Sequence, residues 1–215
     1  MKPGELLCEG AYRIGAELTS EQRELFMLYL RELKTWNRKI NLTGLKNDRD
    51  IVMGHFIDSI SAARFVPEGS RLLDMGSGAG FPGIPIKIVS PSVDVTLLDS
   101  AHKKVMFMRE VIRVLGLEGA AAVWGRAEDE RNGIERRSFE RVITRAVGPV
   151  LNILRLSEPY LARGGRALLM RGQRGGDEWG LAEKGVREKF RLAERRDFTL
   201  PFGGQLRTIL AVERA

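Results

Sequence analysis

An acid followed by alternating glycines, in residues 74–83, is the part of the sequence best suited to binding a small reactive molecule. The apolar run 72–75 predicts a buried parallel strand, and Asp74 lies near its end. Glycines follow at positions 76, 78, 80 and 83, and because glycine has no Cβ, the backbone can adopt φ > 0 and a ligand can lie against it. A helix that begins after such a turn points its free N–H groups and positive dipole end at the ligand. The segment therefore predicts a turn that binds a nucleotide cofactor.

Two cofactors are compatible with this turn. Residues 78–83 satisfy G-x-G-x-x-G, the dinucleotide fingerprint, which favours NAD. A carboxylate two residues before the first glycine, here Asp74, would instead repel a pyrophosphate. The same carboxylate suits S-adenosylmethionine, which carries an ammonium and a sulfonium group and no phosphate. We therefore favour S-adenosylmethionine and keep an NAD-dependent oxidoreductase as the alternative.

A second acid strengthens the cofactor hypothesis. Asp99 closes the apolar strand pattern at 93–98, 25 residues after Asp74. An acid at the end of the second strand can accept hydrogen bonds from both ribose hydroxyls of a bound nucleoside. Glu128 follows the third expected strand at the same edge of the sheet, where it or its backbone can meet the adenine. A purely structural role for the turn and its acids is the less favoured interpretation.

The composition of the 215 residues indicates one globular α/β domain with a small appendage. Hydrophobic residues make up 43% of the chain and charged residues 29%, as in ordinary globular proteins. Cys8 is the single cysteine and there are two histidines, so we expect no disulfide and no metal site. No apolar run is long enough to span a bilayer, and the first residues lack the core of a signal peptide, so we expect a cytoplasmic protein without a membrane partner.

Positive charge is concentrated in the second half of the chain, whose formal net charge as a whole is +7. Residues 1–99 hold 12 Lys/Arg and 13 Asp/Glu, whereas residues 100–215 hold 23 and 15. Most of the excess is arginine, whose planar guanidinium binds phosphate in a fork and stacks on bases. A contribution to solubility explains the same composition equally well. Charge alone therefore leaves nucleic-acid binding as one of two interpretations.

Helix and strand patterns alternate along most of the chain. We expect helices at 4–17, from a cap at Ser20 to about 36, from Asp48 to about 60, and at 84–90, 100–115, 150–161 and 177–190. Strands are expected at 72–75, 93–99, 121–124, 139–144, 166–170, 192–200 and 206–212, with a hairpin turn at 201–204. Five strand–helix units followed by a strand pair predict a doubly wound α/β sheet that is mostly parallel with one antiparallel strand.

His55 and Asp58 form a further polar pair within an expected helix. They lie three residues apart and therefore share one helix face. No nucleophile accompanies them, so we favour a buried polar pair that fixes helix packing over a chemical role.

Several stretches, in matching order from about residue 20 to the C-terminus, together resemble one bacterial family. They are Trp36-Asn37, 41–43, His55 with Asp58-Ser59, 74–85, 97–100 with Lys103-Lys104, 144–146 and the loop at Gly172. The family is the ribosomal RNA small-subunit methyltransferase G family, also called glucose-inhibited division protein B. The glycine turn alone indicates only S-adenosylmethionine. The extension 81–85, with Trp-Asn and Asn-Leu-Thr upstream, is what resembles this family in particular.

The resemblance implies a Rossmann-like, S-adenosylmethionine-dependent methyltransferase core with a seven-stranded sheet at 67–215, preceded by an N-terminal helical extension at 1–66. It implies methyl transfer to N7 of one guanine in 16S ribosomal RNA, in the hairpin near the decoding site. The cofactor residues it implies, with Asp74 added from its position, are Asp74, Gly76, Ser77, Gly78, Gly80, Phe81, Asp99, Ser100, Ala127, Glu128 and Arg145. Relatives often have Lys-Gly where this chain has Arg171-Gly172, so the geometry of any contact there must differ.

Guanine N7 carries a lone pair and no proton, so its methylation needs no general base. We therefore assign no catalytic residue; Asp74 and Glu128 are candidates, by position only, for stabilising positive charge on the ring. The target base has to leave its stack to be reached. Basic residues expected on loops and helix starts, where they can hold RNA phosphates, are Arg38, Lys39, Lys103, Lys104, Arg171 and Arg174.

The expected partner is 16S ribosomal RNA or the 30S subunit. Two other hypotheses remain open from the sequence: a non-catalytic RNA-binding assembly factor that retains the cofactor pocket, and a small-molecule methyltransferase.

Overall fold

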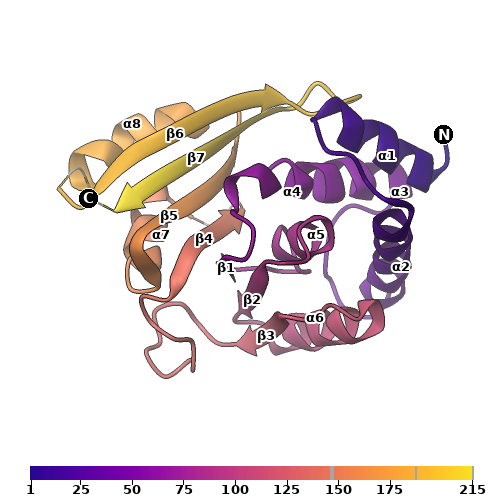
Figure 1. Cartoon of the computed structure of the whole chain (residues 1–215), viewed down its shortest axis with the longest axis horizontal. Coiled ribbons are helices and arrows are strands. Elements are labelled where there is room, and N and C mark those ends of the chain that lie inside the picture. Colours follow the sequence, from indigo (N-terminus) through magenta and orange to yellow (C-terminus); the bar gives the residue numbers. More distant parts are fainter. Residues whose placement is uncertain (146–147, 187, 215) are drawn as a thin grey trace.

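Seven strands form one sheet in the order β3-β2-β1-β4-β5-β7-β6 (Figure 1). The computed structural model describes residues 1–145, 148–186 and 188–214, without the side chain of Glu183. Ala146, part of the family motif at 144–146, lies outside the described residues. The strands are β1 (Arg71–Met75), β2 (Asp94–Asp99), β3 (Ala120–Trp124), β4 (Phe139–Arg145), β5 (Leu161–Gly172), β6 (Phe190–Thr199) and β7 (Leu206–Arg214).

The first five strands are parallel, and β7 is antiparallel to both of its neighbours, β5 and β6. This confirms the expected doubly wound, mostly parallel sheet with one antiparallel strand. The chain runs from β1 outward to β2 and β3, and then returns to β4 on the other side of β1. The strand order therefore reverses between β1 and β4, and a ligand crevice is expected at their carboxyl ends.

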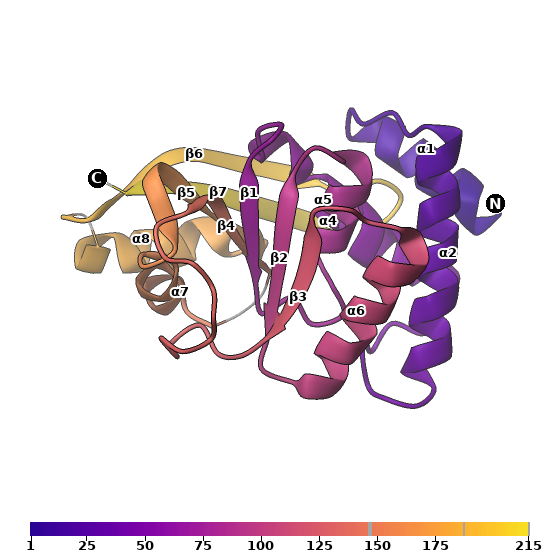
Figure 2. The ribbon, with the colours of Figure 1, turned by 60° about the horizontal axis from the view of Figure 1, so that its bottom comes forward.

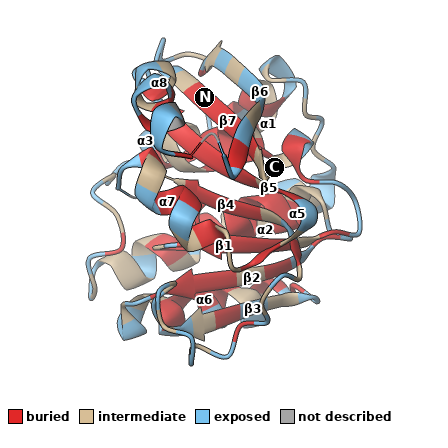
Figure 3. Cartoon of the chain, turned by 90° about the vertical axis from the view of Figure 1, so that its left-hand side faces the viewer, coloured by how far each residue is buried: buried red, intermediate tan, exposed pale blue. Residues whose placement is uncertain are grey.

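Helices cover both faces of the sheet (Figure 2). One face packs α5 (Gly83–Val89) and α6 (His102–Leu115); the other packs α7 (Val150–Ser157) and α8 (Gly175–Val186). Successive strand residues point to opposite faces, so Leu72 belongs to the first hydrophobic cluster and Leu73 to the second. The central strands are buried on both faces (Figure 3), which explains their nearly continuous apolar runs.

The chain before β1 is helical. Its elements are α1 (Pro3–Arg13), α2 (Ser20–Asn37), α3 (Asp48–Ile51), the π-helical turn η1 (Val52–Ile57), α4 (Asp58–Ile60) and the 3₁₀ turn η2 (Ala63–Phe65). Their buried side chains, including Leu7, Phe26 and Ile57, belong to the same hydrophobic cluster as Leu72 and Phe107. The division of the chain at residue 66 stays a prediction.

Several element boundaries differ from the sequence-based expectation. Thr19, and not Ser20, caps α2: its hydroxyl accepts from the Gln22 N–H at 3.1 Å, and the Gln22 side chain accepts from the Thr19 N–H at 3.0 Å. Helix α1 ends at Arg13, four residues earlier than expected. Helix α7 ends at Ser157, although the helix was expected to continue to 161. Strand β5 already begins at Leu161, although the strand was expected to begin at 166. Pro159 explains the end of the helix, because it has no N–H to donate to the Arg155 carbonyl four residues earlier.

No helix among the described residues has the length and apolar character needed to cross a membrane.

Candidate functional site

The glycine turn joins β1 to α5 at the carboxyl edge of the sheet. Gly76, Gly78 and Gly80 have φ values of 77°, 61° and 88°, so all three use the left-handed region that glycine adopts without strain. A Cβ on Gly80 would lie 2.4 Å from Ile84 Cδ1, whereas a Cβ on Gly78 would meet no atom within 4 Å. The two glycines therefore differ: Gly80 allows close packing, and the backbone at Gly78 borders open space that a ligand can enter.

Asp74, at the end of β1, is fully buried. Its Oδ2 accepts a hydrogen bond from the Gly83 N–H at 2.8 Å, but its Oδ1 has no hydrogen-bond partner among the described residues. Burial raises the pKa of this carboxyl to about 7, against the opposing effects of the Gly83 N–H and the Arg145 charge. Oδ1 of Asp74 lacks a hydrogen-bond donor. A cation beside this oxygen would favour the ionised form of the Asp74 carboxyl.

Asp99, at the end of β2, ties the three neighbouring loops together. Its Oδ2 accepts from the Gly78 N–H and its Oδ1 from the Ala101 N–H, both at 2.8 Å. The Gly125 N–H, after β3, donates to the Asp99 carbonyl oxygen at 3.1 Å. Each carboxylate oxygen has a second lone pair, so Asp99 can shape the turn and still accept hydrogen bonds from a ribose.

The other predicted residues on this side lie in the loops after β2 and β3. Ser100 is exposed, and its carbonyl oxygen accepts from the indole N–H of Trp124 at 3.0 Å. The Ala127 carbonyl accepts from the Tyr160 hydroxyl at 2.7 Å. Glu128 is exposed. The Asp99–Gly125 hydrogen bond holds these two loops together beside the glycine turn.

Phe81 was expected to bind the cofactor, but its ring is packed into the protein. It is 4% exposed and stacks on His55, with centroids 4.4 Å apart, and on Tyr29, at 5.3 Å. The Tyr29 hydroxyl donates to the Ala79 carbonyl, within the glycine turn. Phe81 and Tyr29 therefore hold the turn in place from beneath, through contacts with the N-terminal helices.

Arg145, at the end of β4, joins the π-helical turn η1 to the same stack. Its Nη1 donates to the Gly54 carbonyl at 2.9 Å and lies 3.4 Å from Asp58 Oδ2, and its Nη2 lies 2.9 Å from His55 Nδ1. The other Asp58 oxygen accepts from Arg207 Nε of β7 at 3.0 Å. His55 and Asp58, predicted as a polar pair on one helix face, thus both contact Arg145.

These contacts fix the tautomer of His55. A guanidinium offers only donors, so Nδ1 must accept from Arg145, and Nε2 carries the proton that it donates to Thr43 Oγ1 at 2.6 Å. Burial, and then the Arg145 charge, lower the pKa of His55 to about 3. The imidazole is therefore neutral at physiological pH and acts as an acceptor for Arg145.

The chain matches one protein family over most of its length. A family model described as rRNA small subunit methyltransferase G matches residues 22–196. The ribosomal RNA small subunit methyltransferase G of Geobacter sulfurreducens is 39% identical over 209 residues, which cover 96% of this chain and 95% of that protein. The chain belongs to this family.

The methyltransferase also shares its fold with solved structures. A predicted O-methyltransferase from Agrobacterium tumefaciens has a TM-score of 0.62 at 16% identity, over 74% of this chain and 80% of the other. M. jannaschii TYW2 in complex with AdoMet has a TM-score of 0.60 at 15% identity, over 83% and 80%. Membership in the family decides between the two cofactors, and the methyltransferase uses S-adenosylmethionine and not NAD.

The residues of the turn fit this cofactor. The unpartnered Oδ1 of Asp74 suits the ammonium group, the second lone pairs of the Asp99 carboxylate suit the ribose hydroxyls, and the open space at Gly78 lets a ligand approach the backbone. Arg145 makes its contacts with the protein beneath the turn. We infer that Arg145, like the ring of Phe81, positions the turn, and that direct cofactor contacts belong to the remaining predicted residues.

Five of the six predicted RNA-binding residues lie near the surface. Arg38, Lys39, Lys103 and Arg174 are exposed, and Lys104 is half-buried in the first turn of α6. Arg171 differs from the expectation. It is 8% exposed within β5, and its Nη2 donates to the Gly148 carbonyl at 2.8 Å. A buried guanidinium does not lie on an outer rim that holds phosphates.

Sequence reasoning missed several residues that shape the site. Tyr29 lies in the helix expected from Ser20 to about 36 but was not predicted as a site residue, and neither were Arg207 and Glu178. A hydroxyl on an otherwise apolar face was a weak signal for Tyr29, because a buried tyrosine usually needs an acceptor. Nothing in the local pattern around Arg207 or Glu178 pointed to Asp58 or Arg171.

Proposed function

We propose that this methyltransferase transfers a methyl group from S-adenosylmethionine to N7 of one guanine in 16S ribosomal RNA. The observation that carries the proposal is the family match over residues 22–196, a range that contains the glycine turn, Asp74, Asp99 and Arg145. The name of the Geobacter relative specifies ribosomal RNA of the small subunit. The substrate is then the RNA alone or within the 30S subunit, and the protein acts in the cytoplasm, where bacterial ribosomes are assembled.

Methyl transfer to guanine N7 needs no general acid or base. Bound S-adenosylmethionine supplies an electrophilic methyl group, and N7 of guanine offers a lone pair without a proton. The protein therefore has to align the two reactants and exclude water, which accounts for the lack of an assigned general base. Asp74 would hold the ammonium group and Asp99 the ribose, and both side chains are anchored by backbone N–H groups.

The exposed cations support an RNA substrate. Lys103 and Lys104 begin α6, next to the loop that carries Asp99, while Arg38 and Lys39 follow α2. Cations in such positions can neutralise phosphates and orient the RNA without reading its sequence. A small-molecule methyltransferase does not need cations placed to bind phosphates.

The test is methyl transfer in vitro. The protein is incubated with methyl-labelled S-adenosylmethionine and either protein-free 16S RNA or 30S subunits, both from a bacterial strain that lacks its own family member. The RNA is then digested to nucleosides. We expect label in 7-methylguanosine at close to one per molecule in at least one of the two substrates. Binding of RNA and cofactor without transfer would show a non-catalytic assembly factor, and label in another nucleoside would overturn the N7 assignment.

A further inference from the structure

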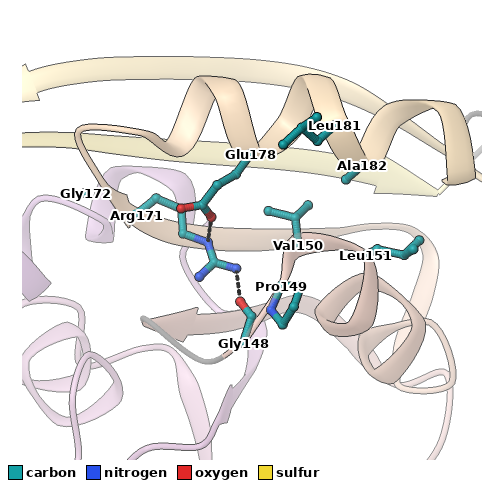
Figure 4. Close-up of a pocket in the computed structure, with 9 residues that line it drawn as sticks. All are labelled: Gly148, Pro149, Val150, Leu151, Arg171, Gly172, Glu178, Leu181 and Ala182. Carbon is teal, nitrogen blue, oxygen red and sulfur yellow. Dashed lines mark hydrogen bonds and ion pairs between the residues drawn. The ribbon is translucent and has the colours of Figure 1, made fainter.

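A pocket of about 640 Å³ opens beside the ends of β4 and β5, outside the glycine turn (Figure 4). Pro149, Val150 and Leu151, at the start of α7, form one wall, and Leu181 and Ala182 of α8 form the facing wall. Arg171 and Glu178 lie together at one end. The pocket therefore combines two apolar walls with one cation and one anion.

Arg171 is the unusual member of this set. It is 8% exposed, and its Nε makes no hydrogen bond, although it lies 3.3 Å from Glu178 Oε2. Its Nη2 is fixed on the Gly148 carbonyl at 2.8 Å. The Glu178 side chain is 43% exposed, so this carboxylate is free to accept further hydrogen bonds. A buried, incompletely paired cation beside an accessible anion is costly to maintain without a ligand.

The register of the sheet places this pocket next to the cofactor turn. Asp74 of β1 pairs with Ile143 of β4, and Ile143 pairs with Leu168 of β5. The carboxyl ends of these three parallel strands therefore share one edge, and β5 lies two strands from β1. With strands about 4.8 Å apart, β5 lies roughly 10 Å from β1 across the sheet, and the pocket at the end of β5 lies on the same edge as the glycine turn.

The ligand chemistry follows from the charged pair and the walls. The Watson–Crick edge of guanine has an acceptor, O6, next to two donors, the N1–H and the N2 amino group. A guanidinium beside a carboxylate matches that order, with the arginine facing O6 and the carboxylate accepting from N1 and N2. The apolar walls at Pro149 and Leu181 suit the faces of a base that has left its stack.

We propose that this pocket holds the target guanine by its Watson–Crick edge, and that Glu178 and Arg171 determine the choice of base. This rests on the proposed function and deepens it. With that edge in the pocket, N7 lies on the other edge of the purine and is free to face the turn. Adenine fits poorly, because its N1 is an acceptor that would meet the carboxylate. A phosphate also fits poorly, because the negative charge of Glu178 repels it.

The test compares two RNA substrates that differ by one amino group. One carries guanine at the methylated position and the other, assembled by ligation, carries hypoxanthine, which keeps N7, N1–H and O6 but lacks the N2 amino group. We expect the kcat/KM of the wild-type protein to be roughly tenfold lower on the hypoxanthine RNA, since one oxygen of the Glu178 carboxylate loses the hydrogen bond from N2. In Glu178→Gln we expect kcat/KM on the guanine RNA to fall at least tenfold and the ratio between the two substrates to shrink below about threefold.

The matched control is Asp177→Asn, which removes the same charge one position earlier on α8 from an exposed side chain outside the pocket. This variant should keep the wild-type ratio, and calorimetry should find the S-adenosylmethionine Kd unchanged in both variants. If the ratio of kcat/KM between the guanine RNA and the hypoxanthine RNA is the same in Glu178→Gln as in the wild type, the pocket proposal alone is overturned. Absence of methyl transfer by the wild-type protein to the guanine RNA would overturn this proposal and the proposed function together.

A second variant guards against a folding defect in Glu178→Gln. Leu181 is 85% exposed and lines the pocket, so Leu181→Trp adds bulk there without disturbing the core. We expect KM for the guanine RNA to rise at least fivefold with the cofactor Kd unchanged. An unchanged KM would contradict occupation of the pocket by the base.

Discussion

Asp74 is the residue at which stability and function conflict most clearly. Its carboxyl is fully buried with one oxygen unpartnered, and burial raises its pKa to about 7 from 3.8. For an acid whose pKa is raised by folding, ionisation opposes folding. The destabilisation begins above the unfolded pKa, grows as pH rises toward 7, and is complete above that. We propose that the ammonium group of the cofactor lies beside the unpartnered oxygen and reverses this effect, so that Asp74 destabilises the free protein and favours the complex.

Replacing Asp74 with Asn is therefore expected to stabilise the free protein at alkaline pH and to weaken cofactor binding. Thermal unfolding without cofactor should show a gain of up to about 4 kcal/mol at pH 8 and of roughly 1.5 kcal/mol at pH 5. Calorimetry at pH 7 should show weaker binding of S-adenosylmethionine. A stability difference that is the same at both pH values would mean that Asp74 is ionised throughout.

Substitution of Gly78 tests whether the cofactor occupies the open space at the turn. Gly78 and Gly116 have φ values of 61° and 62°, and a Cβ on either would meet no atom within 4 Å. Both alanine variants should lose about 1 kcal/mol of stability from backbone strain. Only Gly78→Ala should lose S-adenosylmethionine binding, by at least tenfold in a calorimetric titration. Equal affinities in the two variants would place the cofactor elsewhere.

At the scale of elements, the glycine turn depends on helices far from it in the sequence. Phe81 packs between His55 of η1 and Tyr29 of α2, and Arg145 of β4 contacts both His55 and the Gly54 carbonyl. A π-helical turn is a rare form, frequent at functional sites. Here it provides the carbonyl oxygen and the imidazole that hold Arg145. The N-terminal helices are thus part of the support for the cofactor turn.

His55→Phe should preserve the stack on Phe81 while leaving Arg145 Nη2 and Thr43 Oγ1 without their partner. We expect a loss of about 1–3 kcal/mol at pH 7. Because folding lowers the pKa of His55 to about 3, its contribution is complete above pH 6.5 and is lost as pH falls toward 3. The gap between wild type and variant in urea unfolding should therefore narrow at pH 5. His102→Phe, at the exposed second histidine, is the control. It should change neither the free energy of unfolding at pH 7 nor the dependence of that free energy on pH.

Local sequence patterns predicted the elements but not their contacts. Short apolar runs and the acid–glycine spacing are local, so the strands, the sheet class and the turn were predictable from them. The packing of Phe81 on His55 was not, because an aromatic beside a glycine turn looks the same whether it faces a ligand or the core. The burial of Arg171 was missed for a similar reason: its acceptor, Gly148, comes from another loop.

At the scale of the whole molecule, charge is separated along the chain. Residues 100–215 hold 23 Lys/Arg against 15 Asp/Glu, whereas residues 1–99 are nearly balanced. Several cations are already paired, as Lys189 is with Glu158 at 3.4 Å and Arg191 with Glu213 at 3.0 Å. Paired cations on the β6 side gain little from RNA phosphates, so the exposed cations near the cofactor edge should dominate RNA binding.

RNA affinity should consequently fall steeply with salt, whereas cofactor affinity should change little. Filter binding of 16S RNA between 50 and 200 mM salt measures the slope of log K against log salt. Replacing Lys103 and Lys104 together by Ala should reduce that slope by about two. The paired control, Lys189 and Arg191 to Ala, should leave it unchanged. Equal slopes in both double variants would show that α6 does not face the RNA.

The most direct test of the account maps the methyl group in ribosomes made in cells. A bacterial strain that lacks its own family member is complemented with the wild-type gene, Gly78→Ala or Gly116→Ala, and its 16S RNA is treated by reduction and aniline cleavage, which breaks the strand at 7-methylguanosine. One strand break is expected with the wild type and with Gly116→Ala, and none with Gly78→Ala. A break restored fully by Gly78→Ala, or absent with the wild type, would contradict a guanine-N7 methyltransferase that works from this glycine turn.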